Sequence, residues 1–197
     1  MGTRKGIIKR KTNETEIEVI LDIDGSGLAH VETGVPFLDH MLTLFARHGF
    51  CDLTVKAKGD IEVDDHHTVE DIGICIGLAL KDALGEKERI KRYGTASIPM
   101  DEALVMATID LCGRSYLNFQ LKLDKGKVGN FDIELVEEFF RAFVNNATIV
   151  LHLNQLAGKN YHHIIEATFK AFGRALDESK RFDERLQGVP STKGRLV

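Results

Sequence analysis

The segment HHTVEDIGICIGLALKDAL (residues 66–84) recurs 96 positions later as HHIIEATFKAFGRALDESK (residues 162–180). Apolar residues in both copies return three and four positions apart, as an amphipathic helix requires. The polar matches are as regular, and they pair His66 with His162, His67 with His163 and Glu70 with Glu166. Each copy therefore predicts a helix that begins with two histidines and carries a glutamate one turn later.

A second pair of helices lies upstream of the first pair. PFLDHMLTLFARHG (residues 36–49) and ELVEEFFRAFVNN (residues 134–146) align at an offset of 98, which pairs Phe45 with Phe143. Pro36 suits the first turn of one helix and Gly49 its end. For the histidine helices, Asp64 or Asp65 and Asn160 are the expected start signals, and Gly85 ends the first of them.

Alternating apolar and polar residues predict strands before and between these helices, at residues 15–23, 51–57, 103–111, 116–123 and 148–154. A half-apolar sheet and a helix pair must bury against each other. The sequence thus predicts an α+β protein built by duplication of a unit of about 95 residues, each copy a small β-sheet with two α-helices on one face, the two copies packed into one unit. The expected divisions are residues 1–94, residues 95–187 and a polar tail at residues 188–197.

The composition excludes several classes of protein. The chain has 197 residues, with 26 Lys plus Arg against 30 Asp plus Glu and a net charge of -4, so nucleic acid is not an expected partner. No apolar run is long enough to cross a membrane, and the first residues lack the apolar core of a signal peptide. Three widely spaced cysteines suit reduced thiols. A cytoplasmic protein is expected.

The duplicated histidines indicate metal binding. Positions i and i+4 share one helix face, so His66 with Glu70, and His162 with Glu166, can each offer a nitrogen and an oxygen to one ion. The second histidine of each pair lies about 100° around the helix, which makes chelation of a single ion by both histidines awkward. Two metal sites follow from this geometry.

The upstream helices supply one further ligand to each site, because His40 aligns with Glu138. Symmetry between the copies predicts one ion held by His40, His66, Glu70 and His163, and another by Glu138, His162, Glu166 and His67, with contributions across chains allowed. Nitrogen and oxygen ligands without thiolate favour Mn, Fe, Co, Ni or Zn, and positions left open for substrate favour catalysis.

These features together carry a resemblance. The stretches ETEIEV, PFLDHML, HHTVEDIGI, RYG with PMDEAL, the turn Gly113-Arg114, LAGKNYHHIIEATFKAFGRAL and GVPSTKG span nearly the whole chain. They resemble the imidazoleglycerol-phosphate dehydratase family of histidine biosynthesis. The resemblance implies a hydro-lyase that converts imidazole glycerol phosphate to imidazole acetol phosphate with two Mn²⁺ per active site. It also implies a homo-oligomer of twenty-four chains with sites between subunits.

The resemblance also implies roles for particular residues. Glu14 is expected to face the substrate as acid or base, and Glu70 and Glu166 can relay protons as well as bind metal. The substrate and its phosphate are expected to meet side chains from several segments, namely Glu14, His40, Arg92, Arg114, Lys170, Ser191 and Lys193. Arginine, lysine and Gly-adjacent amides suit a phosphate dianion. One departure is Glu138, where many family members have histidine.

The expected chemistry explains the metals. The leaving group is a poor hydroxide and the lost proton is not beside a carbonyl, so the imidazole ring must act as the electron sink. Metal ions on its nitrogens can stabilise an imidazolate, whose electrons expel the hydroxyl through a diazafulvene-like intermediate. A dinuclear metallohydrolase is the alternative enzyme, and a metal-storage or metal-assembled structural protein is the alternative from another class.

Overall fold

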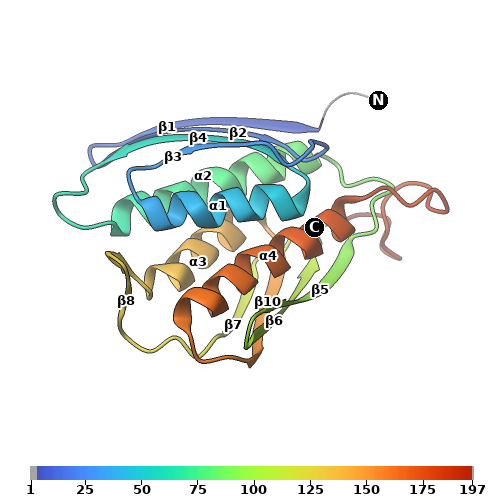
Figure 1. Ribbon diagram of the computed structural model, residues 1–197. Helices are drawn as coiled ribbons and strands as arrows, with labels where there is room; N and C mark the ends of the chain where they lie inside the picture. The colour runs from blue at the N-terminus through green and yellow to red at the C-terminus, as the bar shows by residue number, and fades with distance from the viewer. Residues whose placement is uncertain (1–3, 197) are drawn as a thin grey trace.

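The computed structural model describes residues 4–196 and has four layers in the order sheet, helices, helices, sheet (Figure 1). The first copy contributes the upper sheet and two of the helices, and the second copy contributes the lower sheet and the other two (Figure 1). One hydrophobic cluster runs through both copies, and its largest side chains are phenylalanines of the facing helices. The predicted α+β fold with two packed copies is confirmed.

The elements follow the same order in each copy, apart from one small insertion. The first copy contains β1 (Lys5–Lys11), β2 (Thr15–Asp22), β3 (Ala29–Glu32), α1 (Pro36–Gly49), β4 (Asp52–Gly59) and α2 (His66–Leu84). The second contains β5 (Tyr93–Met100), β6 (Ala103–Asp110), β7 (Tyr116–Gln120), the inserted hairpin β8 (Lys127–Val128) and β9 (Phe131–Asp132), α3 (Leu135–Ala147), β10 (Val150–Ala157) and α4 (Tyr161–Lys180). None of the helices within residues 4–196 combines the length and apolar character needed to cross a membrane.

The two sheets share one topology. The first has the strand order β1-β2-β4-β3 and the second β5-β6-β10-β7. In each sheet the first three strands are antiparallel, and the last strand runs parallel to its neighbour. This repeated order is the structural counterpart of the sequence duplication.

Helices pack across the copies rather than within them. Helix α1 lies against α4, and α2 lies against α3. Two glycines at equivalent positions permit this close approach. A Cβ on Gly77 would lie 2.5 Å from the carbonyl oxygen of Phe143, and one on Gly173 would lie 2.8 Å from that of Phe45. The duplicated glycines and phenylalanines therefore form the same contact twice.

The helix predictions hold closely, and the strand predictions hold in part. Helices α1 and α2 have the expected bounds, and the side chains of Asp64 and Asn160 accept hydrogen bonds from the backbone N–H of His66 and His162, at 2.8 and 2.9 Å. Strands β1, β3 and β5 have no counterpart among the predictions, because their alternation is broken by lysine, proline or short length. Strand β5 also crosses the expected division at residues 94/95.

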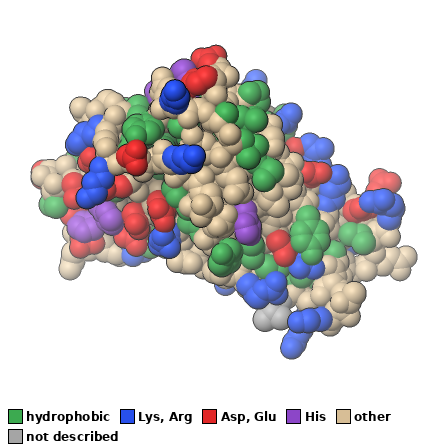
Figure 2. Space-filling view, turned by 90° about the horizontal axis from the view of Figure 1, so that it is seen from below, with side chains coloured by type: hydrophobic (Ala, Val, Ile, Leu, Met, Phe, Trp, Pro, Cys, Tyr) green, Lys and Arg blue, Asp and Glu red, His purple; other side chains and the backbone are tan. Residues whose placement is uncertain are grey.

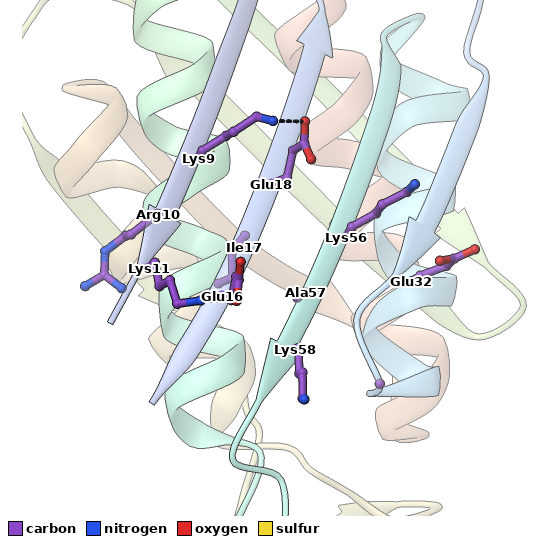
Figure 3. A pocket seen from close by; sticks show the side chains of 11 residues that line it. Lys9, Arg10, Lys11, Glu16, Ile17, Glu18, Glu32, Lys56, Ala57 and Lys58 are labelled. Atoms are coloured by element: carbon purple, nitrogen blue, oxygen red, sulfur yellow. Dashed lines mark hydrogen bonds and ion pairs between the residues drawn. The ribbon is translucent and has the colours of Figure 1, made fainter. Parts of the chain in front are cut away.

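The outer faces of the sheets differ in charge. On the first sheet the register aligns Lys9, Glu18, Lys56 and Glu32 in one row of alternating charge across all four strands. These residues line a shallow hollow of about 570 Å³ on the outer face of the sheet (Figure 3). The second sheet presents mainly uncharged side chains. Figure 2 shows polar and apolar side chains over the middle of the lower side of the molecule and most charged ones toward its ends.

Candidate metal centre and anion pocket

Three side chains of types that can bind a metal meet where α1 crosses the start of α4. The Nε2 atoms of His40 and His162 lie 2.9 and 3.1 Å from Oε1 of Glu166. One donor atom from each residue falls within 4.8 Å of the others, and this is the one group of three or more such residues within residues 4–196. Glu166 is nearly buried, whereas both histidines are half exposed. Nitrogen and oxygen donors converging from one side fit a divalent transition-metal ion.

The charge on Glu166 is strongly stabilised. Burial alone would raise its pKa, but hydrogen bonds from Lys170, His40 and His162 lower the pKa to about 2. The Lys170 Nζ atom lies 2.6 Å from Oε2, so the second carboxylate oxygen is held by lysine and the first faces the histidines. Lys170 Nζ also lies 3.4 Å from Met100 Sδ.

The observed ligand group differs from the expected partition. His40 was expected beside His66, Glu70 and His163, but the structure places it with His162 and Glu166 of the other copy. The physical reason is the cross-packing of helices, which brings α1 onto α4. Spacing along one helix correctly joined histidine and glutamate, whereas the neighbour of that helix depends on packing between the copies.

The first copy repeats this arrangement more loosely. His66 Nε2 lies 3.9 Å from Glu70 Oε2, one turn apart on α2. Glu138 lies in the first turn of α3, at the position equivalent to that of His40 on α1. Helix α3 packs on α2. Among residues 4–196 these three do not form a second tight donor group.

The second histidine of each pair is oriented by a carboxylate that the sequence analysis did not select. His67 Nδ1 lies 3.0 Å from an oxygen of Asp60, and His163 Nδ1 lies 2.6 Å from Glu102. Hydrogen bonding to these partners raises the pKa of both histidines. Carboxylate–histidine pairs of this kind fix the ring and leave Nε2 available to a metal. His67 Nε2 lies 3.9 Å from Glu14, and His163 Nε2 lies 3.7 Å from Asp101.

A signal for Glu102 was present in the sequence. The β1–β2 and β5–β6 hairpins align at an offset of 88, which pairs Gly6 with Gly94 and Glu14 with Glu102. Both glycines allow a helix backbone to approach, namely the carbonyls of Ala79 and Ala175. Asp60 has no such counterpart in the second copy, and nothing in the sequence pattern indicated it.

A pocket of about 390 Å³ adjoins the ligand group. His40 and His162 line it together with aromatic and backbone groups from the start of α1 and the β8–β9 hairpin. Phe37 packs edge-on against His162 with ring centroids 5.3 Å apart and contacts Phe131 at 5.2 Å. The arrangement offers a small planar molecule an apolar wall beside the metal-binding nitrogens.

A second hollow, of about 730 Å³, gathers the residues expected to hold phosphate. Arg92, Arg114, Ser191 and Lys193 all line it. Arg92 donates two hydrogen bonds to the Asp110 carboxylate, at 2.7 and 3.1 Å, and one to a tail carbonyl. It therefore anchors the tail, whereas Arg114 and Lys193 are exposed and free to meet an anion.

The anion pocket and the metal-ligand group lie at opposite ends of the molecule. His162 is in the first turn of α4, and the backbone N–H of Arg92 donates to the Ser179 carbonyl near the end of that helix. Seventeen residues of helix separate these points by about 25 Å. Figure 1 shows the same separation between the start of α4 and the C-terminal tail.

Glu14 lies in the turn between β1 and β2, beside the second metal-ligand histidine of the first copy. Its Oε1 is 3.9 Å from His67 Nε2, and its side chain is about half exposed. The structure thus places Glu14 beside His67, which comes from α2 of the same copy.

The geometry can now be compared with known proteins. Residues 33–176 match the family model described as imidazoleglycerol-phosphate dehydratase. Imidazoleglycerol-phosphate dehydratase of Acetivibrio thermocellus is 60% identical over 193 residues, 98% of this chain and 99% of that protein. The enzyme of Trichlorobacter lovleyi is 61% identical with the same coverage. The crystal structure of the Staphylococcus aureus enzyme has a TM-score of 0.82 and 45% identity, and covers 91% of this chain and 99% of its own. The chain therefore belongs to the imidazoleglycerol-phosphate dehydratase family of enzymes.

Proposed function

We propose that the protein is a hydro-lyase of histidine biosynthesis that removes water from imidazole glycerol phosphate and forms imidazole acetol phosphate. The observation that carries this proposal is the meeting of His40, His162 and Glu166 beside an aromatic-walled pocket, in a chain that also has a basic tail pocket. A ring with two nitrogens and a phosphate are the two ends of that substrate. The cytoplasm is the proposed compartment, and the three buried free thiols suit a reducing environment.

The donor sets support two manganese ions per active site. His40, His162 and Glu166 would hold one, and His66, Glu70 and Glu138 the other by the symmetry of the copies, with His67 and His163 completing the sites of neighbouring chains. When bound, the ions supply positive charge at the ring nitrogens, which stabilises the deprotonated imidazole needed to expel the hydroxyl.

The protein's own side chains move the protons. Glu14 is the proposed acid or base, because its half-exposed carboxylate lies 3.9 Å from Nε2 of His67. Glu166 stays ionised, since its pKa is about 2, and this suits a metal ligand better than a proton donor at neutral pH. Lys170 keeps that carboxylate in place, and Glu70, 3.9 Å from His66, can assist a relay as well as bind metal.

The phosphate is assigned to the tail pocket. Arg114 and Lys193 supply exposed positive charge, and Ser191 supplies a hydroxyl. Arg92 holds the tail through Pro190 O at 2.9 Å while its other nitrogens are occupied by Asp110. Arginine suits this double task because its donors form a fixed fork.

The distance between the pockets supports an active site shared between chains. The substrate spans about six or seven bonds of about 1.5 Å, and so less than about 10 Å. It cannot reach from His162 to the tail of the same chain across about 25 Å of helix. A neighbouring chain must bring its tail to this chain's metal ligands. We propose the homo-oligomer of twenty-four chains on this ground together with the family resemblance.

The test is direct assay of the reaction. The Mn²⁺-loaded protein is incubated with imidazole glycerol phosphate, and formation of the ketone imidazole acetol phosphate is followed, with chelator-treated protein as control. Metal-dependent ketone formation supports the proposal. Release of inorganic phosphate without ketone would instead favour a metallohydrolase, and metal binding with neither product would favour a structural metal protein.

A further inference from the structure

The turn that carries Glu14 is tightly bonded. The Thr12 hydroxyl accepts hydrogen bonds from the backbone N–H of Glu14 at 3.1 Å and of Thr15 at 3.0 Å. The backbone N–H of Thr12 donates to the carbonyl of Thr15 at 2.9 Å. These bonds set the conformation of the turn, but they do not determine where the turn stands relative to α2.

A buried aspartate ties this turn to the metal-ligand helix. Asp71 follows Glu70 on α2 and is only 7% exposed. Its Oδ2 accepts a hydrogen bond from the Thr15 hydroxyl at 2.5 Å and another from Arg10 Nη1. Thr15 is likewise buried. Residues on both sides of the hairpin turn are thus hydrogen-bonded to the Asp71 carboxylate. Asp71 is the neighbour in sequence of Glu70, an expected metal ligand.

The second copy has no such network. The positions equivalent to Arg10, Thr15 and Asp71 are Ile98, Ala103 and Ala167, at offsets of 88 and 96. Ala103 and Ala167 lie in one small buried apolar cluster. At these positions the equivalent hairpin therefore packs on the equivalent helix through apolar side chains. A buried ion pair contributes little net stability compared with good apolar packing, so stability alone does not explain its presence in the first copy.

The turn glutamates of the two copies are also used differently. In the second copy, Glu102 Oε1 accepts hydrogen bonds from the backbone N–H of Lys159 and Asn160, at 3.2 and 2.9 Å, and its other oxygen binds His163. That carboxylate itself fastens the turn to the start of α4. The Glu14 carboxylate accepts no hydrogen bond from any residue in the range 4–196, and its Oε1 lies 3.9 Å from Nε2 of His67.

We infer that Arg10, Thr15 and Asp71 form a positioning network that fixes the Glu14 turn against α2 without using the Glu14 carboxylate. That carboxylate therefore stays free for proton transfer with substrate. This inference rests on the proposed function, in which Glu14 is the acid or base. Where the carboxylate fastens the turn, as in the second copy, apolar packing suffices beneath it. Where the carboxylate must stay free, another group has to fix the turn, and the Asp71 carboxylate on the helix does so by accepting hydrogen bonds from Arg10 and Thr15.

The test replaces the three polar residues of the first copy with the apolar residues found at the equivalent positions of the second copy. The triple variant Arg10→Ile, Thr15→Ala, Asp71→Ala removes all three polar groups together, so no buried charge is left unpaired. We expect it to assemble and to bind Mn²⁺ as the unmodified protein does. We expect kcat to fall about 10- to 100-fold with little change in KM, because a displacement of about 1 Å in a reacting group has an effect of that size.

Two comparisons separate positioning from general loosening. Added to Glu14→Gln, the triple change should reduce kcat no further, because residues acting through one group are not additive. Conversely, Thr15→Ser should retain kcat near the unmodified value, since it keeps the hydroxyl. A control on the same two strands, Lys9→Ala with Glu18→Ala, removes an exposed ion pair of 3.1 Å and should leave kcat unchanged.

The outcomes are distinct. A triple variant with normal kcat, or a further loss of kcat when it is combined with Glu14→Gln, would overturn the positioning role. Full activity of Glu14→Gln would remove the acid or base role of Glu14, and the inference with it. Failure of the unmodified, metal-loaded protein to form ketone would reject the proposed function itself.

Discussion

Mixed assemblies of two inactive variants test whether the active site spans chains. One variant, His162→Ala, lacks a metal ligand, and the other, Arg114→Ala with Lys193→Ala, lacks the free positive charges of the tail pocket. Each should be inactive alone. The two affected regions are about 25 Å apart along α4 in one chain, too far for one substrate molecule to touch both.

The expected recovery follows from counting. If each site takes its metal ligands from one chain and its tail from another, random mixing of equal amounts gives an intact site about a quarter of the time. Co-expressed, differently tagged variants should therefore recover about a quarter of the unmodified activity per chain. A site within one chain would give none, because every chain carries one of the defects.

The control uses two variants from the same half of the site. His162→Ala mixed with His40→Ala should recover nothing, because both residues belong to the ligand group that one chain supplies. Recovery in that mixture would contradict the grouping of these ligands. A first mixture no more active than its components, in assemblies shown to contain both tags, would refute the argument from distance.

Three further results are expected. Gly77→Ala should lower the free energy of unfolding by about 1–3 kcal/mol in denaturant titration, because its Cβ would lie 2.5 Å from the Phe143 carbonyl oxygen; unchanged stability would mean that the helices separate freely. Hydrogen bonds from three backbone N–H groups lower the pKa of Asp52, so Asp52→Asn should destabilise the protein by about 1 kcal/mol at neutral pH. The difference in stability between the two proteins should disappear as the pH falls below about 4 and through the lowered pKa of Asp52. A difference that grows in acid would contradict the lowering of this pKa by folding. Arg92→Lys should raise KM about tenfold, because one ammonium cannot hold both Asp110 and the tail; an unchanged KM would remove Arg92 from phosphate binding.

Local pattern made the helices predictable. The bounds of α1 and α2, the capping role of Asn160 and the pairing of His162 with Glu166 all depend on residues within about one helical turn of each other. The internal repeat extended that information, because two copies with the same spacing predicted one architecture used twice. Three of the edge strands, β1, β3 and β5, were missed since their short or interrupted alternation carries little periodic signal.

The sequence by itself determined the duplicated α+β unit, the histidine and glutamate one turn apart on each histidine helix and the residues of the basic tail, because each depends on helical spacing or on residue chemistry. Only the tertiary structure decided that His40 joins His162 and Glu166, that Glu102 and Asp60 orient the second histidines, and that tail and ligands lie far apart. These facts depend on which helix packs on which. Glycine contacts and core volume between residues distant in the chain set that choice, and no local periodicity records it.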